Sequence, residues 1–182
     1  MAFLIIGLGN PGPRYAATRH NAGYMAVEEI ATATTPTPSS LSVHKKTNTL
    51  VAEATLAGHK VVLATPRSFM NNSGGAVKAL SAFYKIPPQR IIVIHDELDK
   101  DLGSISCDFA GGDHGHNGLK DTTKALGTKD YYRLRIGIGR PPGRMQPARY
   151  VLAPFSARER AELPIVLANA ADLAVETMNK AH

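Results

Sequence analysis

The chain has 182 residues, 43% of them hydrophobic, and carries a formal net charge of +6. This length suits one domain with a sizeable core, so we expect a single domain over residues 1–182. The sequence has no apolar run of about 18 residues and no basic stretch ahead of an apolar segment, which argues against a membrane span and a signal peptide. The single cysteine, Cys107, suits a reducing compartment, so we expect a cytoplasmic protein.

Short apolar runs predict strands, and apolar positions spaced three or four residues apart predict helices. In chain order we expect a strand at 3–7, a helix at 21–31, strands at 49–55 and 60–64, a helix at 73–84, strands at 91–95 and 104–109, a helix at 117–126, a strand at 132–138, and a helix at 157–178 interrupted at Pro164. Residues 34–40 and 140–147 are rich in turn-forming residues, which predicts loops.

The alternation of strands and helices predicts an α/β fold, with helices on both faces of one sheet. Strands 49–55 and 60–64 are joined by a short turn that contains Gly58, a pattern typical of a hairpin. Because a hairpin adds an antiparallel pair, we expect a mixed sheet rather than a purely parallel one.

The first strand leads into residues 7–12, GLGNPG, which match the G-x-G-x-x-G pattern of dinucleotide-binding turns. Such turns present backbone N–H groups to phosphate, and Pro11 and Pro13 are poor at this because proline lacks that hydrogen. The acidic residues about 20 positions on, 28–29, fall within a predicted helix instead of ending a second strand. We therefore favour a catalytic turn over a dinucleotide site.

Four turns of the chain carry asparagine, histidine or aspartate, and three of them follow predicted strands. They comprise residues 9–12 with His20, residues 69–74, residues 95–99 and residues 112–118. In an open α/β sheet such turns meet at the edge where ligands bind, so we expect one shared cleft. Taken alone, each of Asn10, Asn71 and Asn117 also has a structural explanation, because asparagine caps helices and tolerates left-handed backbone.

His20 stands at a predicted helix start, and Asp96 follows an apolar strand. A carboxylate that bonds one imidazole nitrogen fixes the tautomer and favours the protonated ring, which makes the ring a better base. Such a pair can activate water without a covalent nucleophile. We predict that His20 is the general base and that Asp96 orients it, with a helix-capping role as the alternative for His20.

Covalent and metal-dependent chemistry have weaker support. Cys107 lies in the middle of a predicted strand, and the sequence has no G-x-S-x-G motif. His114 and His116 could form a Zn²⁺ or Mn²⁺ site with His20, His95 and Asp96, because imidazole and carboxylate suit these ions. Two histidines in a glycine loop are a weak metal signal, so we expect no metal and no cofactor.

Positive charge is concentrated in one part of the chain. Residues 120–160 contain ten lysines and arginines against three acids, whereas residues 96–113 contain six acids against Lys100. A basic segment of this kind is explained equally by a solvated surface and by a polyanionic partner.

These residues resemble bacterial peptidyl-tRNA hydrolases, which cleave the ester between a peptide and tRNA. The matching positions are residues 7–12, Tyr15, 18–23, Pro66, 69–71, 73–74, 95–99, 115–120 and 133–139. They span nearly the whole chain in one order. The resemblance implies a three-layer α/β/α fold with a mixed twisted sheet, a monomer, and a metal-free hydrolytic site.

By the family pattern, His20 takes a proton from water, Asp96 holds and polarises it, and Asn10 distinguishes a blocked amino group from a free one. The residues expected to bind the peptide, the tRNA 3′ end or the acceptor stem are Tyr15, Phe69, Asn71, His116, Asn117, Lys120 and Arg135. The implied partner is peptidyl-tRNA. A non-catalytic RNA-binding module and a zinc-dependent hydrolase are the alternatives.

The chain departs from the family on the strand after the Asp96 turn. Relatives commonly carry basic side chains there that help an arginine of the 133–138 strand to bind a tRNA phosphate. Here Ser106 and Asp108 stand on that strand. We therefore expect phosphate binding to depend on Arg135 and on Lys120, Lys124 or Arg140, and Asp108 to oppose it if it faces the same patch.

Overall fold

The computed structural model describes residues 1–181, which form one seven-stranded sheet covered by helices. The strands are β1 (Phe3–Gly7), β2 (Ser42–His44), β3 (Thr49–Leu56), β4 (His59–Pro66), β5 (Ile91–Glu97), β6 (Ile105–Phe109) and β7 (Tyr132–Gly137). The helices are α1 (Ala22–Thr32), α2 (Ser73–Tyr84), α3 (Asn117–Leu126), α4 (Pro147–Val151) and α5 (Ala157–Lys180), with 3-10 turns η1 (Arg19–Asn21), η2 (Met70–Asn72) and η3 (Pro88–Arg90).

The sheet is mixed, as the hairpin predicts. Its order is β2-β3-β4-β1-β5-β7-β6. β4, β1, β5 and β7 run parallel to one another, whereas β2, β3 and β6 each pair antiparallel with a neighbour. The parallel strands therefore form the centre of the sheet, and both edges are antiparallel.

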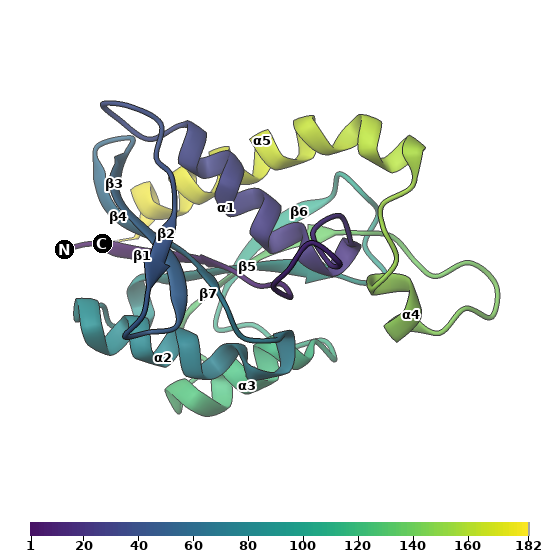
Figure 1. The fold of residues 1–182 in the computed structure, drawn as a ribbon, viewed down its shortest axis with the longest axis horizontal. Helices are drawn as coiled ribbons and strands as arrows, with labels where there is room; N and C mark the ends of the chain where they lie inside the picture. Colours follow the sequence, from purple (N-terminus) through teal and green to yellow (C-terminus); the bar gives the residue numbers. More distant parts are fainter. Residues whose placement is uncertain (182) are drawn as a thin grey trace.

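Helices cover both faces of this sheet, giving the expected three layers (Figure 1). α1 and α5 lie on one face, and α2 and α3 lie on the other. Successive side chains of a strand point to opposite faces, so Phe3 and Ile5 pack beneath α1 and α5 while Leu4 and Ile6 pack against α2 and α3. A strand buried on both faces must be apolar throughout, which explains the continuous hydrophobic run of β1.

The predicted elements are confirmed, with bounds that agree within two residues. α2 and α3 have the bounds expected from the sequence. Each ends where the chain turns left-handed, at Lys85 with φ 55° and at Gly127 with φ 72°. A left-handed residue stops the helical hydrogen-bond pattern, and glycine adopts that conformation without steric cost.

Three features differ from the prediction. The sequence did not indicate β2, whose three residues form a strand by pairing with β3. α4 begins at Pro147, the last residue of a predicted loop. The predicted interruption of α5 at Pro164 is wrong, because the helix is continuous. Leu163 and Val166 are buried on either side of the proline, so packing against the core offsets the lost backbone hydrogen bond.

The arrangement of the sheet brings the polar turns together. Parallel β1 and β5 end side by side, with Gly7 opposite Ile94. The turn after β1, the end of β5 and the loop before α3 therefore meet at one edge. Within residues 1–181, no helix combines the length and the apolar character needed to cross a membrane.

Candidate active site

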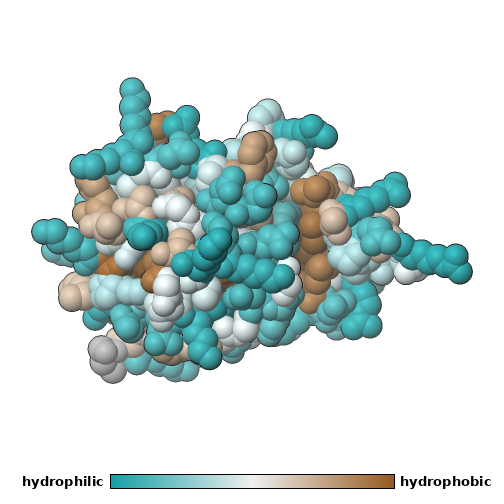
Figure 2. Space-filling model, turned by 90° about the horizontal axis from the view of Figure 1, so that it is seen from below, coloured by the Kyte–Doolittle hydropathy of each residue, from teal (hydrophilic) through white to brown (hydrophobic). Residues whose placement is uncertain are grey.

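A cavity of about 560 Å³ opens at this edge of the sheet. Its polar lining residues are Asn10, His20, Asn71, Asp96, Glu97, His114, His116 and Asn117. Its apolar wall includes Phe69, Met70 and Leu98 together with residues 147–148 and 151–152 of and after α4. Figure 2 shows a strip of hydrophobic side chains on the side of the molecule where α4 projects in Figure 1. The four predicted polar turns therefore share one cleft, as expected.

His20 and Asp96 are in direct contact in this cleft. His20 comes from η1, just before α1, and its Nδ1 lies 2.8 Å from Oδ2 of Asp96, near the end of β5. Because an ionised carboxylate can only accept hydrogen bonds, Nδ1 donates to it, and in the neutral ring Nε2 then keeps a free lone pair. The pair has the geometry of an oriented base, and the His20 side chain remains partly exposed to the cleft.

A second histidine holds the other oxygen of the same carboxylate. Nε2 of His116 lies 2.8 Å from Oδ1 of Asp96. Nδ1 of His116 accepts hydrogen bonds from the backbone N–H groups of Gly118 and Leu119, at 3.1 and 3.3 Å, and so caps α3. An Nδ1 that accepts has no proton, so Nε2 carries it and donates to Asp96.

Asp96 is ionised in this setting. Its side chain is only 2% exposed, and burial by itself would raise the pKa of the carboxyl. The two imidazoles that donate to its oxygens outweigh burial and hold the pKa of Asp96 well below its usual range. The site therefore has a fixed negative charge directly behind the base.

His20, Asp96 and His116 are also the group that a metal ion would require, since their donor atoms lie within 4.8 Å of one another. Binding through Nε2 of His116 would need that nitrogen unprotonated. The proton would then have to move to Nδ1, which faces two backbone N–H donors of α3. The donor set therefore fits a hydrogen-bonded triad better than a metal site.

Asn10 is fixed by contacts on both sides. Its backbone N–H and C=O bond the side chain of Asn21 at 2.8 and 2.9 Å. Its Oδ1 accepts the backbone N–H of Met70 at 2.7 Å, an arrangement that settles which end of the amide is the oxygen. Asn10 therefore offers the cleft the N–H donors of its Nδ2.

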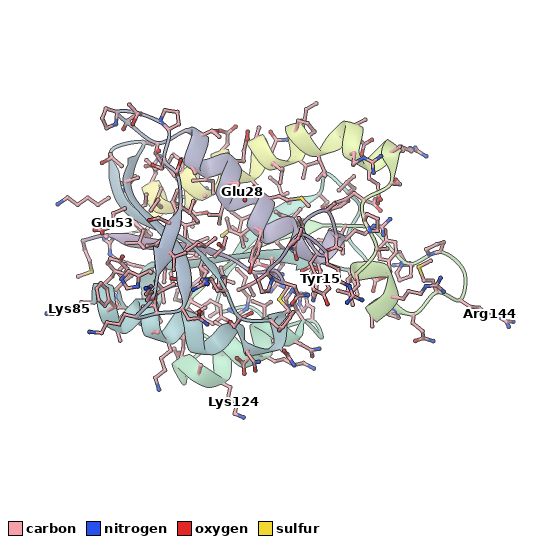
Figure 3. The ribbon with its side chains drawn as sticks, in the orientation of Figure 1. Tyr15, Glu28, Glu53, Lys85, Lys124 and Arg144 are labelled. Carbon is pink, nitrogen blue, oxygen red and sulfur yellow. The ribbon has the colours of Figure 1, made fainter. Side chains whose placement is uncertain are left out.

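The remaining predicted ligands lie around the rim. Asn71 in η2 and Asn117 at the start of α3 are exposed and line the cavity. Phe69 is 54% exposed, and Tyr15 packs edge to face against it at a centroid distance of 6.1 Å. Figure 3 shows Tyr15 on the side of the molecule that carries α4. The rim thus offers amides and aromatic faces.

Arg19 directly precedes His20 and connects the α4 part of the apolar wall to the segment that carries the base. Its guanidinium pairs with Glu159 of α5 at 2.8 Å, bonds the carbonyl of Tyr150 in α4 at 3.1 Å, and stacks on the Tyr150 ring. Its backbone N–H also bonds the carbonyl of Ala153. The sequence prediction assigned no element to residues 148–156 and placed Pro147 at the end of a loop, so this wall was missed. The missed signal was Pro147, since proline is common at the first position of a helix.

The predicted phosphate ligands differ in exposure. Lys120 is exposed on α3. Lys124 on the same helix points away from the body of the molecule (Figure 3), and Arg140 is exposed and pairs with Asp99 at 3.0 Å. Arg144, in the loop before α4 and not among the predicted ligands, also points away from the body. Arg135 is only 1% exposed and bonds other parts of the protein. That Arg135 binds phosphate stays a prediction, and its burial weighs against it.

His95, fully buried behind the site, is a further imidazole that stays neutral. Its Nδ1 donates to the backbone oxygen of Asp96 at 2.8 Å, and its ring packs against His116 at a centroid distance of 5.0 Å. Burial and the neighbouring His116 lower the pKa of His95 well below its ordinary value. His95 therefore stays uncharged, and the rings that donate to the Asp96 carboxylate are those of His20 and His116.

Comparisons with known proteins point to one family. The family model described as Peptidyl-tRNA hydrolase matches residues 4–182. A peptidyl-tRNA hydrolase of Corynebacterium diphtheriae is 59% identical over 93% of this chain and 92% of its own. One from Mycolicibacterium smegmatis is 53% identical over 93% and 87%.

A solved structure shows the same fold. The crystal structure of peptidyl-tRNA hydrolase from Acinetobacter baumannii superposes with a TM-score of 0.81 at 34% identity, covering 99% of this chain and 95% of that one. The family model, the two relatives and the solved structure each match nearly the full length of this chain. The chain belongs to the peptidyl-tRNA hydrolase family.

Proposed function

We propose that this protein hydrolyses the ester bond between the peptide and the 3′-terminal ribose of peptidyl-tRNA, and so returns free tRNA to translation. One observation carries the proposal. In a chain of this family, Asp96 holds His20 by Nδ1 and leaves its Nε2 free in a cleft lined by amides. An ester is activated enough for a positioned water and a base to cleave it.

In the proposed reaction, Nε2 of His20 accepts a proton from a water molecule as that water attacks the ester carbonyl. The ionised Asp96 stabilises the imidazolium that forms, because both partners then carry full and opposite charge. The ribose oxygen leaves when the tetrahedral intermediate collapses, and it takes the proton from His20. The base is thereby restored for the next turnover.

Amide donors are proposed to stabilise the negative oxygen of this intermediate. Asn71 and Asn117 line the cavity and have side chains able to donate. One such donor typically contributes about 3 kcal/mol to transition-state stabilisation. Asn10 is proposed to select the substrate, because its Nδ2 donor suits a peptide carbonyl and repels a free ammonium group.

The tRNA is proposed to lie along exposed cations of α3 and of the loop before α4, two segments that each border the cleft, at Asn117 and at Pro147. Lys120, Lys124 and Arg144 supply charge that attracts a phosphate backbone, while Tyr15 and Phe69 offer aromatic faces to the unpaired bases of the 3′ end. All of the proposed catalytic groups come from one chain, so we propose that a monomer is active. Because the substrate arises in translation, we propose that it acts in the cytoplasm.

The test is hydrolysis of an N-acetyl-aminoacyl-tRNA in the presence of EDTA. We expect the wild type to remain active in the chelator. We expect His20→Ala to lose about 10²- to 10⁴-fold in rate, the usual contribution of a general base, with tRNA affinity within a few fold. His59→Ala is the matched control, because His59 begins β4, at the end of the sheet opposite the cleft, and contacts Asn179.

Two results would contradict the proposal. A wild type that binds the tRNA without releasing the amino acid would be an RNA-binding module. Activity that is lost in EDTA and restored by Zn²⁺ would indicate a metal-dependent hydrolase, despite the donor set described above.

A further inference from the structure

Arg135 is a buried residue of β7 whose three guanidinium nitrogens all bond other parts of the protein. Nε donates to Oδ2 of Asp108 at 3.0 Å. Nη1 donates to both carboxylate oxygens of Glu97 at 3.2 and 3.3 Å, and Nη2 donates to the backbone oxygen of Gly112 at 2.7 Å. Buried arginine donors that are satisfied in this way hold a fixed geometry.

These bonds join three separate segments of the chain. Glu97 ends β5, Asp108 belongs to β6, and Gly112 lies in the loop that leads to α3. The loop fits closely around the guanidinium, since a Cβ on Gly111 would come within 2.8 Å of Nη2. His114 of the same loop also reaches Glu97, with 2.5 Å between Nδ1 and Oε2.

The loop that Arg135 holds carries part of the site. His116 follows two residues after His114, bonds Asp96 and caps α3, whose first residue is Asn117. A shift of the loop would therefore move both a partner of Asp96 and a proposed oxyanion donor. A displacement of about 1 Å in a catalytic group can cost about 10²-fold in rate.

We propose that Arg135 is a positioning residue, which locks the loop of residues 110–116 so that His116 and Asn117 hold their places in the site. This inference rests on the proposed function. A direct role in phosphate binding fits the contacts less well, because the guanidinium is 1% exposed and faces two carboxylates. The cluster of Arg135, Glu97 and Asp108 has no excess positive charge to attract phosphate.

Two substrates separate positioning from phosphate binding. One is N-acetyl-aminoacyl-tRNA, and the other is the N-acetyl-aminoacyl ester of adenosine, which has no phosphate. We expect Arg135→Lys to lower kcat by a similar factor, about 10- to 100-fold, on both substrates. We expect the salt dependence of tRNA affinity to stay unchanged, whereas Lys120→Ala should flatten it.

The opposite pattern would overturn the proposal. If Arg135→Lys hydrolyses the adenosine ester at the wild-type rate, Arg135 does not position the site. A slope of log affinity against log salt flattened by about 0.7 to 0.9 would then mark a lost phosphate contact. A wild type that hydrolyses neither substrate would instead contradict the proposed function itself.

Asp108→Asn keeps the test decisive if Arg135→Lys does not fold. The Asp108 side chain is 53% exposed, so its replacement should destabilise the fold less than replacement of the buried Arg135. Positioning predicts a several-fold fall in kcat on the adenosine ester, because the bond to Nε is weakened. Release of Arg135 toward phosphate predicts an unchanged ester rate and tighter tRNA binding. Asp130→Asn, which removes the same charge from an exposed site, is the matched control.

Discussion

His116 offers a sharp test of the site, because its two ring nitrogens have separate tasks that two substitutions can separate. Nδ1 caps α3, and Nε2 donates to Asp96. Asparagine is among the best helix caps, but its shorter side chain does not extend as far as Nε2 does. His116→Asn should therefore keep the cap and lose the bond to Asp96, whereas His116→Ala should lose both.

The magnitudes follow from these two contacts. A hydrogen bond to a charged group contributes about 1.5–3 kcal/mol, so His116→Asn should lower the free energy of unfolding by that amount. Loss of an N-cap costs about 1 kcal/mol more, which should appear as the difference between His116→Ala and His116→Asn. Both variants should also hydrolyse peptidyl-tRNA more slowly, because Asp96 loses a bond that holds the carboxylate against His20.

Urea unfolding at pH 7 and single-turnover hydrolysis measure the two effects, with His59→Ala as the control for loss of an imidazole. The reasoning is refuted if His116→Asn and His116→Ala are equally stable, since the imidazole would then provide no cap. It is equally refuted if His116→Asn keeps both the stability and the rate of the wild type.

Three further predictions concern Asn10, Asp96 and Cys107. Asn10→Ala should narrow the ratio of hydrolysis rates between N-acyl-aminoacyl-tRNA and free aminoacyl-tRNA, and an equal loss on both substrates would exclude a selective role. In Asp96→Asn, the free energy of unfolding should fall less steeply than in the wild type as the pH drops below about 4. Because the folded-state pKa of Asp96 is lowered, its stabilisation is complete above the unfolded pKa of about 3.9 and is lost as the pH falls, which denaturation at pH 2 to 5 measures. A wild-type slope in the variant would contradict this. Burial raises the pKa of the Cys107 thiol, so iodoacetamide at pH 8 should alkylate it more slowly in the folded protein than in urea, and equal rates would contradict that burial.

Most of the fold could be predicted because local signals agree with the tertiary structure. β1 and β5 are apolar on both faces, and α2 and α3 end at residues that adopt left-handed backbone. β2 could not be predicted, since three residues have no periodicity and exist as a strand only through pairing with β3. The predicted break at Pro164 does not occur because burial of the helix around the proline outweighs its local preference.

The individual residues of the site could be predicted more readily than the hydrogen bonds that connect them. His20 and Asp96 stand at positions where an α/β sheet presents ligands, and the structure places them in contact. The bond from His116 depends on left-handed backbone at His114 and Gly115, which the sequence does not specify. Alternation along β7 puts Arg133 and Arg135 on one face, but only the path of the loop from 110 to 116 decides that they are buried.

The contacts of Arg19 mean that the width of the cleft and the alignment of the base are mechanically coupled. A swing of α4 away from the body would break the bond from Arg19 to Tyr150 and pull on the backbone beside His20. In an opened cleft the backbone beside His20 would have lost these contacts, and the bond from Nδ1 to Asp96 would be left to hold the ring. Glu159, in the first turn of the long α5, pairs with Arg19 and extends this coupling to the C-terminal helix.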